Sequence, residues 1–216
     1  MKRVIMLAAM IACFASVSLA QDKARPEFFA GFSVNSIDTG LRTATGGAFA
    51  DSDRETGFGF ETSATGYFNK QLGIEGNVDG HFKTKDFSFI TCAGLGCPPP
   101  TVRAKIQTYN FMVGPHVRLS NDVESKVTPF VHALLGANHS RVSSDTVGAD
   151  VNDSETDFAL KLGGGVDFSV SPRVGVRLSA DYNPIFQPED SSFNTNINGG
   201  RRTRNDAVFS VGVVFK

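Results

Sequence analysis

The chain has 216 residues, of which 21 are Lys or Arg and 22 are Asp or Glu, so its formal net charge is −1. This balance excludes the strongly basic surface by which many proteins bind nucleic acid. The length suits a single domain. The composition is rich in Gly (22) and Phe (19) and lacks Trp, and no long amphipathic helical pattern is present.

The first twenty residues have the features of a secretory signal peptide. Met1, Lys2 and Arg3 give a positive start, residues 4–12 are apolar, and Ser18-Leu19-Ala20 is a small-x-small cleavage pattern. We expect residues 1–20 to be removed after Ala20, which leaves a domain over 21–216, or 216 less 20 residues. The apolar stretch is shorter than the roughly 20 residues that a membrane-spanning helix needs. A lipoprotein, with Cys13 at the new N-terminus, is the alternative, but apolar sequence continues past Cys13.

Residues of alternating polarity begin near Phe28 and recur to the end of the chain. The clearest stretch is "LGIEGNVDGHFK", residues 72–83, in which the even positions are apolar or Gly and the odd positions from 75 onward are polar. Alternation with period two gives a β-strand with two chemically opposite faces. We predict eight such strands, whose apolar faces in chain order are residues 28–34 (even), 58–68 (even), 74–82 (even), 109–119 (odd), 127–135 (odd), 158–168 (even), 174–182 (even) and 207–215 (odd).

The connections between the predicted strands alternate in length. Short links near residues 69–72, 120–126 and 171–173 alternate with long ones near 36–56, 84–104, 139–155 and 184–205. The strands are therefore joined by short connections at one end of the sheet and by long connections at the other. Barrels of the bacterial outer membrane have this arrangement, with short periplasmic turns and longer outer loops. We predict an all-β fold: an eight-stranded antiparallel up-and-down transmembrane β-barrel with four long outer loops.

Aromatic residues gather at the two ends of the predicted strands. Phe28, Phe68, Phe168 and Phe215 fall at the periplasmic ends, and Phe58, Phe82, Tyr109, Phe158 and Tyr182 fall toward the outer ends. Two aromatic bands are typical of membrane interfaces, although Phe also has a high intrinsic β propensity. The apolar strand faces are thus expected to meet lipid, with the polar faces turned into the barrel.

Two cysteines, Cys92 and Cys97, remain in the expected mature chain, in "TCAGLGCPPP". An exported chain meets an oxidising compartment, so we predict a disulfide between them. Closing so small a loop contributes about 2 kcal/mol in the chain-entropy model. Metal binding by the pair is the weaker alternative, because no His lies nearby.

Several segments of the second half resemble the OmpA/OmpX-like family of small outer membrane β-barrel proteins: "NFMVGPHVRL", "VTPFVHALLGA", "FALKLGGGVDFSVSPRVGVRLSADY" and "FSVGVVFK". The resemblance implies a barrel fold and integral location in the bacterial outer membrane, reached by export with a signal peptide. It also implies recognition of the last strand by the barrel-assembly machinery, for which Gly212 and Phe215 match the spacing. Lys216 departs from the aromatic that usually closes such chains. None of these segments contains a catalytic motif.

The polar faces supply the candidate site, the barrel interior. Eight strands enclose a bore that side chains can fill, and buried charges persist when they are paired. Because both signs are present, we expect a network of paired charges and hydrogen bonds, and a narrow channel for ions or small solutes is the alternative. The predicted lumen residues are Glu61, Glu75, Asp79, His81, Lys83, His116, Arg118, His132, Lys161, Asp167, Arg177 and Asp181.

Metal binding and catalysis are not expected. His116 and His132 face inward across a short turn, but the sequence places no third ligand beside them, so we predict hydrogen bonding and no cofactor. No base, nucleophile and orienting group come together at the outer rim, which leaves a lipid-modifying enzyme as the third possibility. Arg201, Arg202 and Arg204, after "NTNINGG", could contact lipopolysaccharide phosphates, but an ordinary charged loop is the favoured interpretation. The favoured hypothesis is a non-enzymatic structural or surface-interaction barrel with outer membrane lipid as a partner and the loop partner unknown.

Overall fold

The structure is a computed structural model that describes residues 26–38, 54–88, 101–120, 125–146, 149–187 and 203–216. The predicted signal peptide, the Cys92–Cys97 pair, and Arg201 and Arg202 lie outside these residues. In the described part of the chain, no helix is long and apolar enough to span a membrane.

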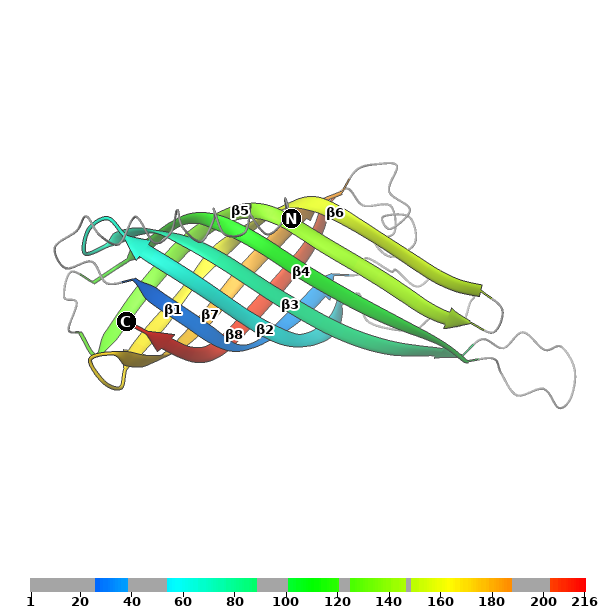
Figure 1. The fold of residues 1–216 in the computed structure, drawn as a ribbon, viewed down its shortest axis with the longest axis horizontal. Helices are drawn as coiled ribbons and strands as arrows, with labels where there is room; N and C mark the ends of the chain where they lie inside the picture. Colours follow the sequence, from blue (N-terminus) through cyan, green and yellow to red (C-terminus); the bar gives the residue numbers. More distant parts are fainter. Residues whose placement is uncertain (1–25, 39–53, 89–100, 121–124, 147–148, 188–202) are drawn as a thin grey trace, which may run out of the picture.

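Eight antiparallel strands form one closed barrel in sequence order, and β1 completes it by pairing with β8 (Figure 1). This confirms the predicted strand number and topology. Closure pairs the backbone N–H and C=O groups of every strand with a neighbour, which is what a sheet needs in order to cross hydrocarbon. The strands are β1 (Glu27–Asp38), β2 (Arg54–Tyr67), β3 (Leu72–Ser88), β4 (Thr101–Arg118), β5 (Val127–Thr146), β6 (Ala149–Ser169), β7 (Val174–Phe186) and β8 (Thr203–Phe215).

The polar and apolar faces point as the alternation predicts. On β3, Ile74 keeps 43% of its surface exposed, whereas its neighbour Glu75 keeps 1%. The same inversion holds around the barrel, because most large apolar side chains lie on the outside and most buried side chains are polar or charged. A soluble barrel would reverse this arrangement, since exposure of apolar surface to water is unfavourable. The outer surface therefore suits lipid.

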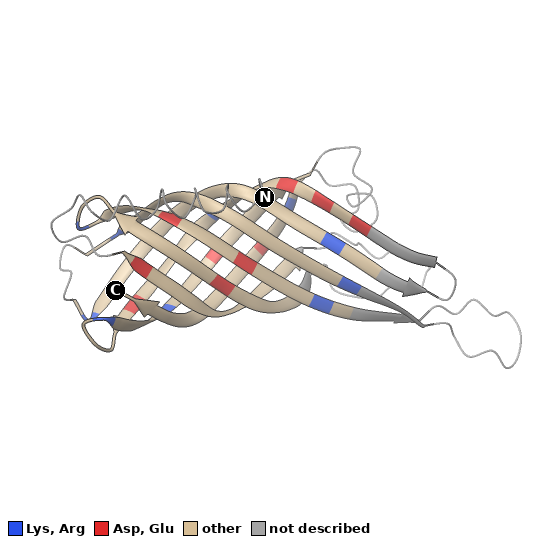
Figure 2. Ribbon diagram, in the orientation of Figure 1, with Lys and Arg blue, Asp and Glu red and all other residues tan. Residues whose placement is uncertain are grey.

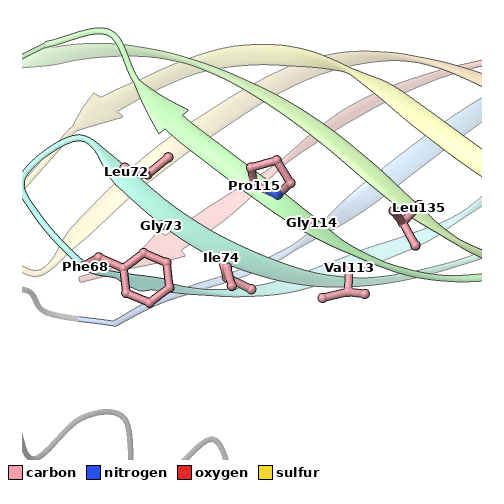
Figure 3. Close-up of a pocket in the computed structure, with 8 residues that line it drawn as sticks. All are labelled: Phe68, Leu72, Gly73, Ile74, Val113, Gly114, Pro115 and Leu135. Carbon is pink, nitrogen blue, oxygen red and sulfur yellow. The ribbon is translucent and has the colours of Figure 1, made fainter.

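The lipid-facing surface includes a shallow apolar groove near the end where the short turns lie (Figure 3). It is lined by residues of β3, β4, β5 and the turn before β3. The lining contains no charged residue: Phe68, Leu72, Gly73, Ile74, Val113, Gly114, Pro115 and Leu135. Lipid acyl chains can fill such a groove without covering a charged side chain.

Strands β3 to β6 are much longer than the others. They have 17, 18, 20 and 21 residues, against 12 to 14 in β1, β2, β7 and β8. A strand needs about 9–11 residues to cross a bilayer, so the surplus projects beyond the barrel, where Figure 1 shows four strands extending as one sheet. We call the parts of β3–β6 over residues 83–88, 101–107, 139–146 and 149–157 the extension.

The extension corrects one predicted loop. The stretch 139–155 is not a long loop, because β5 continues to Thr146 and β6 begins at Ala149. Its polar composition suggested a loop, but residues 141–146 of β5 pair one by one with residues 154–149 of β6, from Arg141 with Ser154 to Thr146 with Ala149. The short links predicted at 69–72, 120–126 and 171–173 do connect β2 to β3, β4 to β5, and β6 to β7.

Close strand contact explains the Gly at position 136. A Cβ built at Gly136 would press against the carbonyl oxygen of Phe111 and lie 2.9 Å from the Cα of Met112, whereas at the lipid-facing Gly76 it would meet nothing within 4 Å. We predict that Gly136→Ala lowers the free energy of unfolding by about 1–3 kcal/mol, as overpacking does, and that Gly76→Ala leaves it unchanged or slightly raises it. Urea unfolding in detergent micelles, followed by heat-dependent gel mobility, measures both; equal effects would contradict the assigned packing.

Candidate functional site

The barrel interior contains nearly all of the predicted lumen residues. Ten of the twelve are buried inside the barrel: Glu61, Glu75, Asp79, His81, His116, His132, Lys161, Asp167, Arg177 and Asp181. Arg118 is partly buried at the periplasmic end, and Lys83 is half-buried at the base of the extension. The residues fall into layers along the barrel axis.

The layer nearest the periplasmic end is centred on Glu27, the first residue of β1. Its carboxylate pairs with Arg118 from β4 and with Arg177 from β7, 3.4 Å away, and accepts a hydrogen bond of 2.7 Å from the Tyr67 hydroxyl. Arg177 also donates two bonds, of 2.7 and 2.9 Å, to Asp167. The Arg118 guanidinium lies 3.7 Å above the Tyr67 ring centroid. Such bidentate and stacked contacts suit Arg better than Lys.

The next layer contains two histidines and two carboxylates. His116 on β4 and His132 on β5 are paired directly across the strands. The Nδ1 atoms of both rings lie against the same oxygen of Glu75, at 2.7 and 2.9 Å, and His132 Nε2 lies 2.9 Å from Asp181. The His116 ring stacks on Phe130 with centroids 4.7 Å apart.

The middle layer is built around Lys161 of β6, a lysine with none of its surface exposed. Its Nζ donates to Glu61 (3.1 Å), Asn77 (3.0 Å) and Asp79 (2.7 Å), which uses all three of its protons. Glu61 is on β2, four strands away from β6 on either path around the barrel. The ammonium group therefore ties opposite walls together across the bore.

Neutral side chains continue the network toward the outer end. The Asn110 amide donates to Asp79, Asn138 donates to Asn110, and Ser140 donates to Asn138, over distances of 2.6, 2.6 and 2.8 Å. Arg204 belongs to this region: only 2% of its surface is exposed, and it pairs with Asp206 at 3.1 Å. The expectation that Arg204 contacts lipopolysaccharide is thus wrong, because β8 begins at Thr203 and the alternation turns position 204 inward.

The interior carries more negative than positive side chains. Among the described residues, eight buried carboxylates face three buried cations, Lys161, Arg177 and Arg204, or four with the partly buried Arg118. The carboxylates are Glu27, Glu61, Glu75, Asp79, Asp157, Asp167, Asp181 and Asp206. Since unpaired buried charge is costly, protons or cations must offset the difference.

The structure also brings together a Ser, a His and an Asp that the sequence did not connect. Ser33 Oγ lies 2.9 Å from His81 Nε2, and His81 Nδ1 lies 3.3 Å from Asp79. This order of groups is that of a nucleophilic triad. However, Ser33 has none of its surface exposed, and the Asp79 oxygens are already engaged by Asn110 and Lys161. No acyl substrate can reach the hydroxyl, so the three residues form part of the internal network.

The two residues of the predicted assembly signal lie on opposite faces of β8. Phe215 keeps 51% of its surface exposed on the lipid side. Gly212 pairs with Gly31 of β1 and Arg177 of β7, and a Cβ there would press on the backbone of Ala30 and Gly31. Gly212 thus also has a packing role at the seam that closes the barrel.

The model of the outer membrane protein beta-barrel domain family matches residues 5–216. The chain belongs to this family. Among curated proteins, none matches the sequence.

This chain aligns with nearly the whole length of three solved structures that have the same fold. Ail, the attachment invasion locus protein of Yersinia pestis, aligns with a TM-score of 0.53 at 15% identity, over 90% of this chain and 99% of that one. Neisserial surface protein A gives 0.51 at 19% identity, over 90% and 99%. A major outer membrane protein of Thermus thermophilus gives 0.52 at 11% identity, over 88% and 99%. At these identities the likeness establishes the barrel fold alone.

Some members of the network were not found by sequence reasoning. Glu27 and Tyr67 share the inward phase of β1 and β2, but they sit at strand ends, where a one-residue difference in the boundary hides them. Ser33 is at an odd position of β1, as Glu27 is, and the alternation of this strand could have identified it as an inward residue. The convergence of Glu75 on both histidines depends on strand stagger, which alternation alone does not specify.

The Lys161 layer yields a stability prediction. Lys161→Met leaves Glu61 and Asp79 without their cation, so we predict a loss of about 3–5 kcal/mol, the cost of breaking a buried ion pair. Lys70→Met, at an exposed turn position, is the matched control and should change stability by less than about 0.5 kcal/mol. Urea titration of the folded barrel in micelles measures both. Equal stability of the two variants would show that Lys161 does not bridge the bore.

Proposed function

We propose that the protein is a sealed, non-enzymatic barrel that acts at the cell surface through its extension, where outward-facing cations hold phosphate groups of lipopolysaccharide. The proposal includes export by the N-terminal signal peptide and insertion by the barrel-assembly machinery. The observation that supports it best is a change in the outward face of β3–β6, which is apolar over the barrel and polar and basic on the extension.

The change occurs just beyond the outer aromatic residues. Phe82, Tyr109 and Phe158 face outward at the top of the barrel, and the Phe82 and Tyr109 ring centroids are 5.8 Å apart. The outward positions on the extension are polar: Thr84 on β3, Gln107 and Lys105 on β4, Arg141 on β5, and Thr156 and Ser154 on β6. Aromatic rings favour the interface between hydrocarbon and headgroups, so the polar positions lie at headgroup level and above.

Lys105 and Arg141 provide the cationic surface. Both are exposed, and they lie on the neighbouring strands β4 and β5, where Arg141 pairs with Gln107 and Lys105 pairs with Ser143. Directly paired residues share a face, so the two cations project from the same side, two positions apart along the strands. Figure 2 shows these basic positions on β4 and β5 of the extension, whereas the basic position on β3 and the acidic positions on β6 have odd numbers and belong to the inward face. Phosphate groups of the outer leaflet would meet the basic side.

We predict that Lys105→Gln/Arg141→Gln weakens binding of lipopolysaccharide to the folded barrel about tenfold, as expected when two exposed charge contacts of roughly 0.7 kcal/mol each are lost. The matched control is Lys70→Gln/Lys126→Gln, which removes the same charge from exposed positions at the periplasmic end. Fluorescence anisotropy of labelled lipopolysaccharide, at low and high salt, measures the affinity. The difference should shrink as salt rises, and equal weakening in both double variants would overturn the proposal.

A narrow channel is the second candidate, and the excess of lumen carboxylates favours it by making the interior attractive to cations. The bridges across the bore, from Lys161 to Glu61 and from Arg118 to Glu27, argue for a sealed interior. We therefore predict no steady conductance of the reconstituted barrel in planar bilayers. A stable cation-selective current would replace the sealed barrel with a channel.

A further inference from the structure

We propose that Glu75, His116 and His132 form a binding site for a divalent transition-metal ion, of which Zn²⁺ fits best. The site lies inside the barrel near its periplasmic end and is separate from the lipopolysaccharide-binding surface proposed above. Each of the three residues offers one ligand atom, and these atoms lie within 4.8 Å of one another.

Strand register brings the three ligands together. His116 is directly paired with His132 on β5 and with Gly73 on β3, which places Glu75 two residues further along the same inward face. Three adjacent strands therefore contribute one ligand each. Gly73 and Gly114, which pair with His116 and Glu75, carry no side chain that could compete for the inward positions.

The donor set is one that zinc uses. Two imidazole nitrogens and a carboxylate oxygen are a common set of protein ligands for a tetrahedral Zn²⁺ ion whose fourth position is taken by water. With metal–ligand distances near 2.1 Å, donor atoms in such a site are about 3.4 Å apart. The Glu75 oxygen is 2.7 and 2.9 Å from the two Nδ1 atoms. A small rotation of the carboxylate away from the rings would make the space for an ion.

The surrounding residues hold the histidines as ligands. His132 Nε2 lies 2.9 Å from an oxygen of Asp181, and a ring N–H donated to a carboxylate is the usual support of a metal-ligating His, since it leaves the other nitrogen free to coordinate. The His116 ring is fixed by stacking on Phe130. Among the described residues, the buried His116 Nε2 has no hydrogen-bond partner, whereas Nδ1 lies against Glu75.

Charge supports the same assignment. Both nitrogens of His132 lie 2.9 Å from carboxylate oxygens, of Glu75 on one side and Asp181 on the other. A divalent ion would add positive charge to an interior in which, among the described residues, buried carboxylates outnumber buried Lys and Arg. The ion would then connect β3, β4 and β5 as a structural staple.

The burial of the site determines how an ion enters. All three ligands are buried, and Arg118 over Tyr67 forms part of the layer between them and the periplasmic end. We therefore expect Zn²⁺ to be taken up readily while the barrel folds and much more slowly by the folded barrel.

The test uses the full mature chain without a histidine tag, unfolded in urea with a chelator and refolded into detergent micelles with Zn²⁺. After removal of free ion, elemental analysis should find one zinc per chain. His116→Gln and His132→Gln should lose it, and His81→Gln, which changes a buried lumen histidine outside the site, should retain it. Asp181→Asn should weaken binding about 10–100-fold, as loss of a supporting carboxylate does.

A second measurement does not depend on whether the variants fold. Refolding of the wild-type chain with Cu²⁺ should give an electron paramagnetic resonance spectrum with splitting from two imidazole nitrogens. Absence of zinc from the refolded wild type, equal zinc in the ligand variants and in His81→Gln, or a copper spectrum without nitrogen splitting would each overturn the site.

Discussion

The structure depends on one constraint: the hydrocarbon of a bilayer can satisfy neither charges nor unpaired backbone groups. The closed sheet satisfies the backbone, and strict alternation along each strand sends ionisable side chains inward. Once inside, these side chains have no bulk water, so each must find a partner of opposite charge or a hydrogen bond. The layers of the lumen are the consequence. Lys161, with three acceptors and no exposed surface, is the clearest example.

The same constraint explains how the barrel is divided for function. Inside the membrane, outward side chains are apolar and inward side chains bind one another through ion pairs and hydrogen bonds. The spanning segment therefore has little surface left with which to bind a partner. Beyond the aromatic residues the constraint is lifted, and β3–β6 can be polar on both faces. The cations Lys105 and Arg141 appear on the outward face only there. A rigid barrel that carries a projecting sheet is a suitable arrangement for contacts at the cell surface, because the sheet is positioned by the strands beneath it.

The sequence predicts the fold well because period-two alternation repeats over eight strands. A one-residue shift in the register of a strand would turn its charged side chains toward lipid. The sequence predicts less about the site, because contacts across the bore join residues far apart in the sequence, such as Lys161 with Glu61, 100 positions away, and with Asp79, 82 positions away. Alternation shows that Glu75 faces inward but not that its carboxylate meets two histidines. The extension was also missed, since polar strands beyond the membrane have the composition of loops. Arg204 was placed wrongly because the start of β8 was set too late.

The central claim is the direction of the strand faces, and a single spin label at Val78 tests it. The chain, with its cysteines replaced by Ser, would carry Val78→Cys with a nitroxide label and be refolded into phospholipid vesicles. The account predicts that apolar oxygen relaxes this label efficiently while a water-soluble nickel chelate does not, as at a position facing acyl chains. Strong relaxation by the nickel chelate and weak relaxation by oxygen would mean that Val78 faces water, which contradicts the assigned orientation.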